Sequence, residues 1–149
     1  MEYTIVMNSK SQHITETMIQ AALVDYCRYR KVDPYLLHIP NQQPLFGILH
    51  ALRKNLSKSI KIRLNRQIWG YWTTLKKIGF QQGVSDLFLS LPRGDFHGLW
   101  LEVKNFPNKP TIVQKEFLER MRKVGYAAHV IDDIEKGIKI IKSYLSLSN

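Results

Sequence analysis

Asp86, Glu102 and Lys104 are the residues of this chain whose types and spacing point most directly to chemistry. In the run LWLEVK, Leu101 and Val103 alternate with Glu102 and Lys104, and side chains in a β-strand alternate between its two faces. A carboxylate and an ammonium group therefore project side by side from one face. Because their neighbours are apolar, we expect this strand to be half buried, and charges placed there cost free energy unless they pair or bind something.

A hairpin would bring the third residue to the same place. Two apolar runs, at 86–91 and 99–105, are separated by the turn-rich PRGDFHG, which predicts two antiparallel strands. Pairing of these strands can bring Asp86 near Glu102, and two converging carboxylates form a hard-oxygen site that suits Mg²⁺ or Mn²⁺. Lys104 could then hold or help to deprotonate an attacking water and offset charge in the transition state. On spacing alone, a salt bridge on a sheet face is the simpler explanation of the same residues.

The remaining elements would support this hairpin. Residues 11–30 contain no Gly or Pro and predict an amphipathic helix, with Glu16 and Gln20 one turn apart at the edge of its apolar face. The residues expected on the apolar face are Ile14, Met18, Ala22, Tyr26 and Tyr29.

Thr111 opens a further helix, because Thr111 and Gln114 match the two ends of a capping box. The order of helices and strands indicates an α/β or α+β sheet with helices packed against it. The other expected elements are a short strand at 35–39, basic helices at 45–56 and 60–77, a strand at 127–131 and an amphipathic helix at 134–145.

The composition fits one globular domain spanning 1–149, with 44% hydrophobic residues and a formal net charge of +10. No acidic residue occurs between Asp33 and Asp86, whereas Lys and Arg are frequent there. Clustered cations of this kind favour a polyanionic partner such as nucleic acid. An ordinary solvated basic face or a membrane-surface patch is the alternative.

Cellular location is constrained only weakly by the sequence. Cys27 is the sole cysteine, so no internal disulfide can form, and we expect it to be buried in a protein of the reducing cytoplasm. The first ten residues lack the features of a signal peptide, and no apolar run approaches the length of about 20 residues needed to span a bilayer. We therefore expect a soluble, cytoplasmic protein.

Several motifs in order resemble the VRR-NUC branch of the PD-(D/E)XK nuclease superfamily. They are GVSDLFL at 83–89, GLWLEVK at 98–104, TIVQ at 111–114 and GYA at 125–127, together with HIPN at 38–41 and the early helix with Glu16 and Gln20. The resemblance covers nearly the whole chain and implies an α/β restriction-endonuclease-like fold, in which helices flank a central mixed β-sheet. Two departures are Ser85, where many members have proline, and a longer, more basic stretch at about 44–69, which we interpret as a helical insertion.

The resemblance also implies roles for individual residues. Asp86 and Glu102 match the metal-binding acids, Lys104 the catalytic lysine and Gln114 the glutamine of the following helix. The backbone carbonyl of Val103 would be another metal ligand, and Glu16 matches an acid that completes the metal site directly or through water. Gln114 could instead serve only the capping box, and Glu16 could be a surface residue.

The function that this resemblance implies is Mg²⁺- or Mn²⁺-dependent endonuclease activity on branched, Holliday-junction-like DNA, by a homodimer in a bacterial or phage-infected cell. A non-catalytic nucleic-acid-binding module and a sequence-reading restriction-type nuclease are the alternatives. Trp69, Tyr71 and Trp72 could stack on bases, or form core or a dimer interface. The residues expected to bind DNA are Lys58, Lys61, Arg63, Arg66, Lys76 and Lys77.

Overall fold

The computed structural model describes residues 14–39, 51 and 55–148. These residues belong to two compact units. The larger unit combines 14–39 with 83–148, and the smaller one lies within 40–82. The larger unit contains the sheet and the predicted chemical residues, and the smaller unit contains a single long helix among its described residues.

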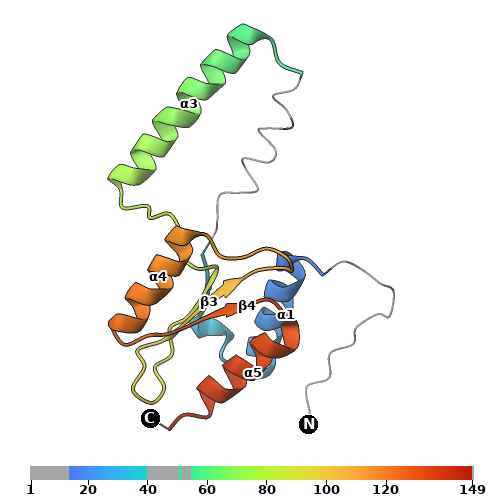
Figure 1. Cartoon of the computed structure of the whole chain (residues 1–149), viewed down its shortest axis with the longest axis vertical. Helices are drawn as coiled ribbons and strands as arrows, with labels where there is room; N and C mark the ends of the chain where they lie inside the picture. Colours follow the sequence, from blue (N-terminus) through green and yellow to red (C-terminus); the bar gives the residue numbers. More distant parts are fainter. Residues whose placement is uncertain (1–13, 40–50, 52–54, 149) are drawn as a thin grey trace. The chain divides into compact units, whose positions relative to one another are not determined.

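A four-stranded mixed sheet forms the centre of the larger unit (Figure 1). Its strand order is β1 (Leu36–His38), β2 (Leu87–Leu89), β3 (Leu99–Val103) and β4 (Ala127–Ile131). The first two pairings are antiparallel and the pairing of β3 with β4 is parallel. The predicted hairpin and mixed sheet are therefore confirmed, although both hairpin strands are shorter than expected.

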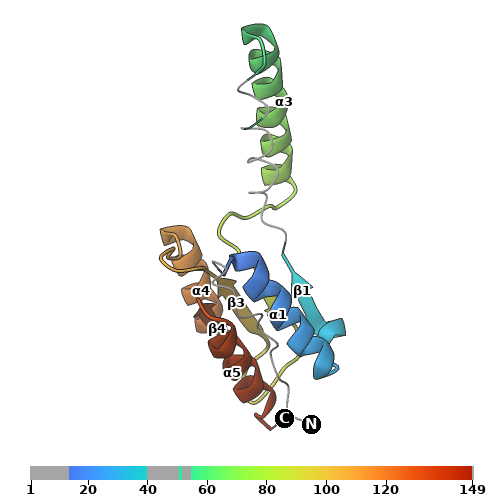
Figure 2. The same ribbon diagram turned by 90° about the vertical axis from the view of Figure 1, so that its right-hand side faces the viewer.

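Helices cover both faces of this sheet. Helices α1 (Glu16–Tyr29) and α5 (Ile134–Leu145) pack side by side on one face, and α4 (Ile112–Lys123) lies on the other (Figures 1 and 2). Leu101 and Val103 of β3 belong to the core that α1 and α5 close, whereas the Trp100 ring packs edge-on against Phe117 of α4. The expectation of a half-buried strand was wrong, because α4 covers the second face.

Helix α1 begins where a side chain can cap it. The Thr15 hydroxyl accepts a hydrogen bond from the Met18 amide at 3.2 Å, and the helix starts at Glu16. Residues 11–13 of the predicted helix lie outside the described residues. Met18 and Tyr29 are exposed, so their predicted place on the inner face was wrong. The buried stripe is Ile19, Leu23, Tyr26 and Cys27.

The remaining helices agree closely with the sequence pattern. The capping box of Thr111 and Gln114 is present at the start of α4, and β4 and α5 have the predicted bounds. The helix predicted at 60–77 is α3 (Lys58–Lys77), which buries none of its residues. Most of the helix predicted at 45–56 lies outside the described residues. No helix in the described part of the chain is both long and apolar enough to cross a membrane.

Candidate active site

A glycine turn sets the start of β2 against the first turn of α4. Gly83 has a φ of +81°, a conformation that residues with a side chain rarely adopt. A Cβ atom at this position would lie 2.7 Å from the Val113 side chain and 2.9 Å from its backbone carbonyl carbon. Both the backbone conformation and the lack of space for a side chain therefore require glycine here. The close contact between Gly83 and Val113 fixes the segment that leads to Asp86.

The hairpin register places the two carboxylates opposite each other. Leu87 pairs with Leu101, so extending the antiparallel register by one residue sets Asp86 opposite Glu102. The Asp86 Oδ2 atom accepts a hydrogen bond from the Val103 amide at 2.9 Å, so the carboxylate bonds the neighbouring strand directly. Asp86 is 4% exposed, which makes it a buried group held by main chain.

Glu102 projects from β3 towards α4 and is fully buried. Its Oε1 atom accepts hydrogen bonds from the Lys104 ammonium at 2.7 Å and from the Gln114 side-chain amide. Its Oε2 atom is buried and has no hydrogen-bond partner among the described residues. A buried carboxylate oxygen without a donor is costly, so this atom has the capacity to accept a hydrogen bond or to bind a cation.

The surroundings of Glu102 shift its acidity. Burial, and then the charge of Asp86, raise the pKa of Glu102 from its ordinary value of 4.5 to about 7, against the opposing effect of Lys104. Two neighbouring carboxyl groups repel each other when both are negatively charged, unless a cation compensates the charge. A divalent cation between them would remove that repulsion and favour the charged form of both.

Lys104 is an ammonium group at neutral pH. Burial opposes its charge, but the hydrogen bond and charge of Glu102, followed by Glu16 and Asp86, raise the pKa of Lys104 above 10.5. It can donate hydrogen bonds and offset negative charge, as the sequence analysis expected. A role of Lys104 in deprotonating water remains a prediction.

Glu16 stands beside Lys104 rather than beside the two buried acids. Its Oε1 atom lies 4.0 Å from the Lys104 Nζ atom and accepts a hydrogen bond from the Asn105 amide at 3.4 Å. Its side chain is 33% exposed, consistent with the predicted position at the helix edge. A role of Glu16 in metal binding, directly or through water, remains a prediction.

Gln114 contacts both the start of its own helix and the Glu102 carboxylate. Its Oε1 atom accepts a hydrogen bond from the Thr111 amide at 2.9 Å, which completes the capping box. Its Nε2 atom donates to Glu102. The start of α4 is thereby tied to the centre of β3, and the orientation of the Glu102 carboxylate is fixed from that helix.

The donor set fits a small divalent cation. Asp86 and Glu102 supply carboxylate oxygens, one of them without a hydrogen-bond partner in the described part of the chain. Val103 directly follows Glu102 in β3 and adds a main-chain carbonyl. Within 14–39, 51 and 55–148, no cluster of three or more His, Cys, Asp or Glu side chains could hold a metal. Mg²⁺ is commonly held by one or two carboxylates with water and substrate phosphate completing its shell, so two acids suffice.

Ser85 is a buried polar residue that the sequence analysis did not assign to the site. It is 0% exposed and directly precedes Asp86, and its hydroxyl has no hydrogen-bond partner among the described residues. The only feature of the sequence that pointed to Ser85 was a hydroxyl residue beside an acid at the start of an apolar run.

The other predicted residues lie away from the two acids in the chain. His38 is exposed on β1 opposite Leu87, and the predicted DNA-binding residues all lie on α3 in the smaller unit.

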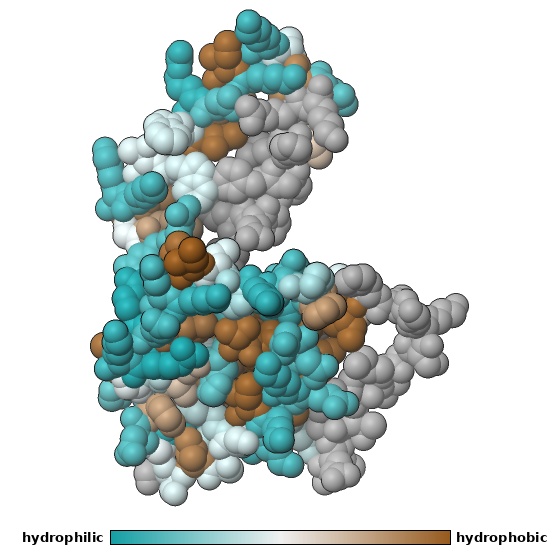
Figure 3. All heavy atoms as spheres, in the orientation of Figure 1, coloured by the Kyte–Doolittle hydropathy of each residue, from teal (hydrophilic) through white to brown (hydrophobic). Residues whose placement is uncertain are grey.

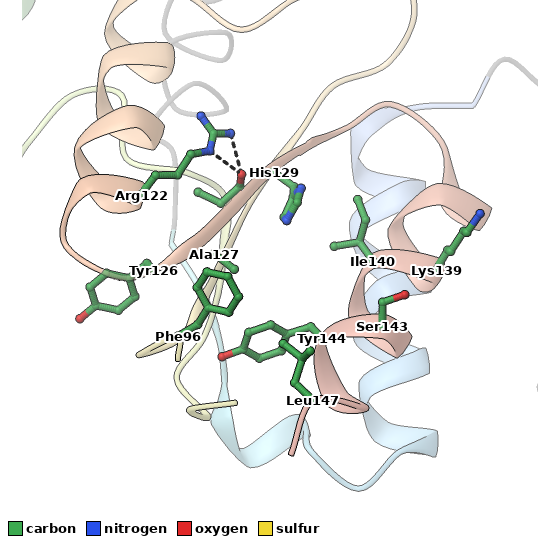
Figure 4. A pocket seen from close by; sticks show the side chains of 11 residues that line it. Phe96, Arg122, Tyr126, Ala127, His129, Lys139, Ile140, Ser143, Tyr144 and Leu147 are labelled. Atoms are coloured by element: carbon green, nitrogen blue, oxygen red, sulfur yellow. Dashed lines mark hydrogen bonds between the residues drawn. The ribbon is translucent and has the colours of Figure 1, made fainter. Parts of the chain in front are cut away.

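A hollow of about 630 Å³ lies along β4, between α4 and α5 (Figure 4). Apolar side chains such as Phe96, Tyr144 and Leu147 form much of its lining, and none of the described residues that line it is acidic. Arg122 at its rim donates two hydrogen bonds to the Ala128 carbonyl. Its described lining therefore offers no carboxylate to a metal ion and includes neither Asp86 nor Glu102.

The fold is that of a VRR-NUC domain. A solved structure described as "VRR_NUC domain protein" superposes with a TM-score of 0.69, covers 93% of both chains and is 24% identical in sequence. This similarity confirms the expected fold, and the mixed sheet with flanking helices agrees with a PD-(D/E)XK-like architecture. No protein-family model and no curated protein matches the sequence.

Proposed function

We propose that this protein is a divalent-metal-dependent DNA endonuclease whose active site comprises Asp86, Glu102 and Lys104. The observation that carries the proposal is the buried Glu102 Oε2 atom, which has no hydrogen-bond partner in the described residues. Its strand β3 is bonded directly to Asp86 through the Val103 amide. A salt bridge alone would need only Oε1, which Lys104 already engages. The fold adds support, because the VRR-NUC proteins that this chain resembles are nucleases.

Asp86, Glu102 and the Val103 carbonyl would hold Mg²⁺ or Mn²⁺. The chemistry supplied by such an ion when bound is Lewis acidity toward a phosphate oxygen and an attacking water. Gln114 keeps one oxygen of Glu102 in a fixed direction through its hydrogen bond. The direction of the other Glu102 oxygen is therefore already fixed before a cation and a phosphate would bind.

Lys104 would act as a fixed positive charge. Its ammonium group already donates to Glu102 at 2.7 Å and lies 4.0 Å from Glu16. From this position it can donate to the attacking water or to a phosphate oxygen and offset charge that develops on the phosphate. Glu16 would limit the mobility of Lys104 from the start of α1.

The DNA partner is proposed from charge. The net charge is +10, and helix α3 carries the basic residues without any acidic neighbour between Asp33 and Asp86. Phosphate contacts by Lys and Arg supply affinity without sequence preference. Branched DNA and a homodimer are proposed from the resemblance, because a twofold dimer presents two active sites to the symmetric strands of a four-way junction.

Substrate preference can be tested with end-labelled DNA of different shapes. Four-way junction, fork, flap and linear duplex of the same sequences would be incubated with the protein in Mg²⁺ or Mn²⁺, with EDTA as the metal-free control. We expect cleavage in metal and strongest cleavage of the branched substrates. Cleavage confined to one duplex sequence would favour a restriction-type enzyme, and tight binding without cleavage in either metal would favour a non-catalytic binding module.

A further inference from the structure

Helix α3 displays a tryptophan on its charged face. Trp69 is 75% exposed, and Arg66, Thr73 and Lys76 lie within seven residues of it at spacings that share one side of a helix. The surface view shows hydrophilic side chains together with apolar ones along this helix (Figure 3). A large indole surface in water next to cations is an unusual arrangement for a helix that needs only to be soluble.

The structure distinguishes Trp69 from the other two aromatic residues of the cluster. The Trp72 ring is half buried and contacts the Phe80 ring at a centroid distance of 5.5 Å, so it has a packing role. Tyr71 follows Trp69 by two residues and therefore points away from it on the helix. Trp69 alone among the three combines high exposure with basic neighbours.

A small hollow adjoins the exposed indole. It measures about 200 Å³ and is lined by Trp69, Trp72, Thr73, Lys76 and Gln82. This volume is below the range of about 300–1,000 Å³ typical of drug-sized ligands, and it suits one flat ring. Its walls combine two indoles with a cation and an amide, which are groups that stack on a base and contact its edge or phosphate.

We infer that this face of α3 binds an unpaired nucleobase, which stacks on Trp69 while Arg66 and Lys76 contact the flanking phosphates. The inference rests in part on the proposed function and deepens it. The substrate would be DNA with at least one unstacked base, as occurs at forks, bulges and imperfect junctions. Fully paired duplex offers its phosphates to the cations but no open base face to the indole.

Charge and residue placement favour nucleic acid over a membrane surface. An interfacial membrane helix separates its cations from Trp, Phe and Leu on opposite faces. In α3 the exposed indole shares the face of Arg66 and Lys76, whereas Leu64, Ile68 and Leu75 are half buried on the other side. A membrane would have to accept the cations together with the indole, while nucleic acid uses both.

The test measures binding by the full-length protein in EDTA, so that its result does not depend on cleavage. The probes are a labelled duplex with one unpaired thymine, the same duplex fully paired, and vesicles of phosphatidylserine and phosphatidylcholine. The variants are Trp69→Ala, Trp69→Phe and, as the matched aromatic control on the other side of the helix, Tyr71→Ala. Because Trp69 is on the surface, its substitution leaves the packing of Trp72 on Phe80 in place.

We expect Trp69→Ala to weaken binding of the unpaired-base duplex by about 5- to 150-fold, the range for loss of one base–aromatic stack. Affinity for the paired duplex should change by less than about twofold. Trp69→Phe should retain most of the affinity and Tyr71→Ala all of it. An equal loss on both duplexes, or a loss confined to vesicles, would overturn the inference. Absence of cleavage with this binding pattern intact would refute only the proposed function.

Discussion

Replacing Glu102 with Gln should stabilise the metal-free protein at alkaline pH while abolishing its function. Lys104 and Gln114 donate hydrogen bonds to Glu102, and the substitution must not remove them. The carbonyl oxygen of the glutamine amide can still accept both. The substitution removes the ability of the side chain to ionise. The perturbation therefore isolates the free energy of one buried charge.

The magnitude follows from the pKa of Glu102, which burial and Asp86 raise from 4.5 to about 7 in the folded protein. A carboxyl whose pKa is higher when folded favours folding while it is protonated. Its contribution to stability is fully present below about pH 4.5 and is lost as the pH rises through 7. A rise of about 2.5 in pKa corresponds to a loss of up to about 3 kcal/mol between those limits.

Urea unfolding in EDTA from pH 4 to pH 8 would measure this difference. Trp100 fluorescence would report on the larger unit when Trp69 and Trp72 are replaced by Phe. The free energy of unfolding of Glu102→Gln, minus that of the Glu102 protein, should increase by up to about 3 kcal/mol across this range. Glu119→Gln, an exposed carboxylate on α4, should show no such increase. A difference that stays constant with pH would refute the assignment of a strained charge to Glu102.

Three further substitutions probe the remaining groups. Lys104→Ala should reduce cleavage by at least about 100-fold while DNA binding stays within about twofold, because loss of one charge stabiliser costs about 2.7–4 kcal/mol in comparable sites; gel-based cleavage and binding assays measure both, and retained cleavage would remove Lys104 from the mechanism. Asp86→Asn keeps an acceptor for the hydrogen bond across the hairpin, so thermal unfolding should show a folded protein that has lost metal-dependent cleavage; unaltered cleavage would exclude Asp86 as a metal ligand. Reversing the charges of Lys58, Lys61 and Arg63 should weaken DNA binding and flatten its dependence on salt concentration, and an unchanged salt slope would show that this part of α3 does not contact DNA.

Much of the fold could be predicted because its signals are local. The bounds of β4 and α5 follow from an apolar run and a helical period with a capping residue, and the hairpin follows from its turn. The inner face of α1 was predicted less well, because Met18 and Tyr29 fit the helical period yet lie in solvent. Periodicity defines an apolar stripe only approximately, and the packing partner selects which side of it is buried.

The candidate site was predictable in outline for the same reason. Alternation along β3 and the antiparallel register together place Asp86, Glu102 and Lys104 within one neighbourhood. The burial of Ser85 could not be predicted, nor could the lack of a hydrogen-bond partner for one Glu102 oxygen among the described residues, since both depend on α4 covering the sheet. The fold of a VRR-NUC domain does not by itself fix a substrate, because function resides in the site and the surface around it.

Cleavage of a labelled DNA four-way junction by the unmodified protein and by Glu102→Ala, each with Mn²⁺ and with EDTA, tests the central claim most directly. We predict strand cleavage only for the unmodified protein in Mn²⁺, with junction binding retained by Glu102→Ala. Equal cleavage by both proteins, or cleavage that persists in EDTA, would contradict a metal-dependent site built on Glu102.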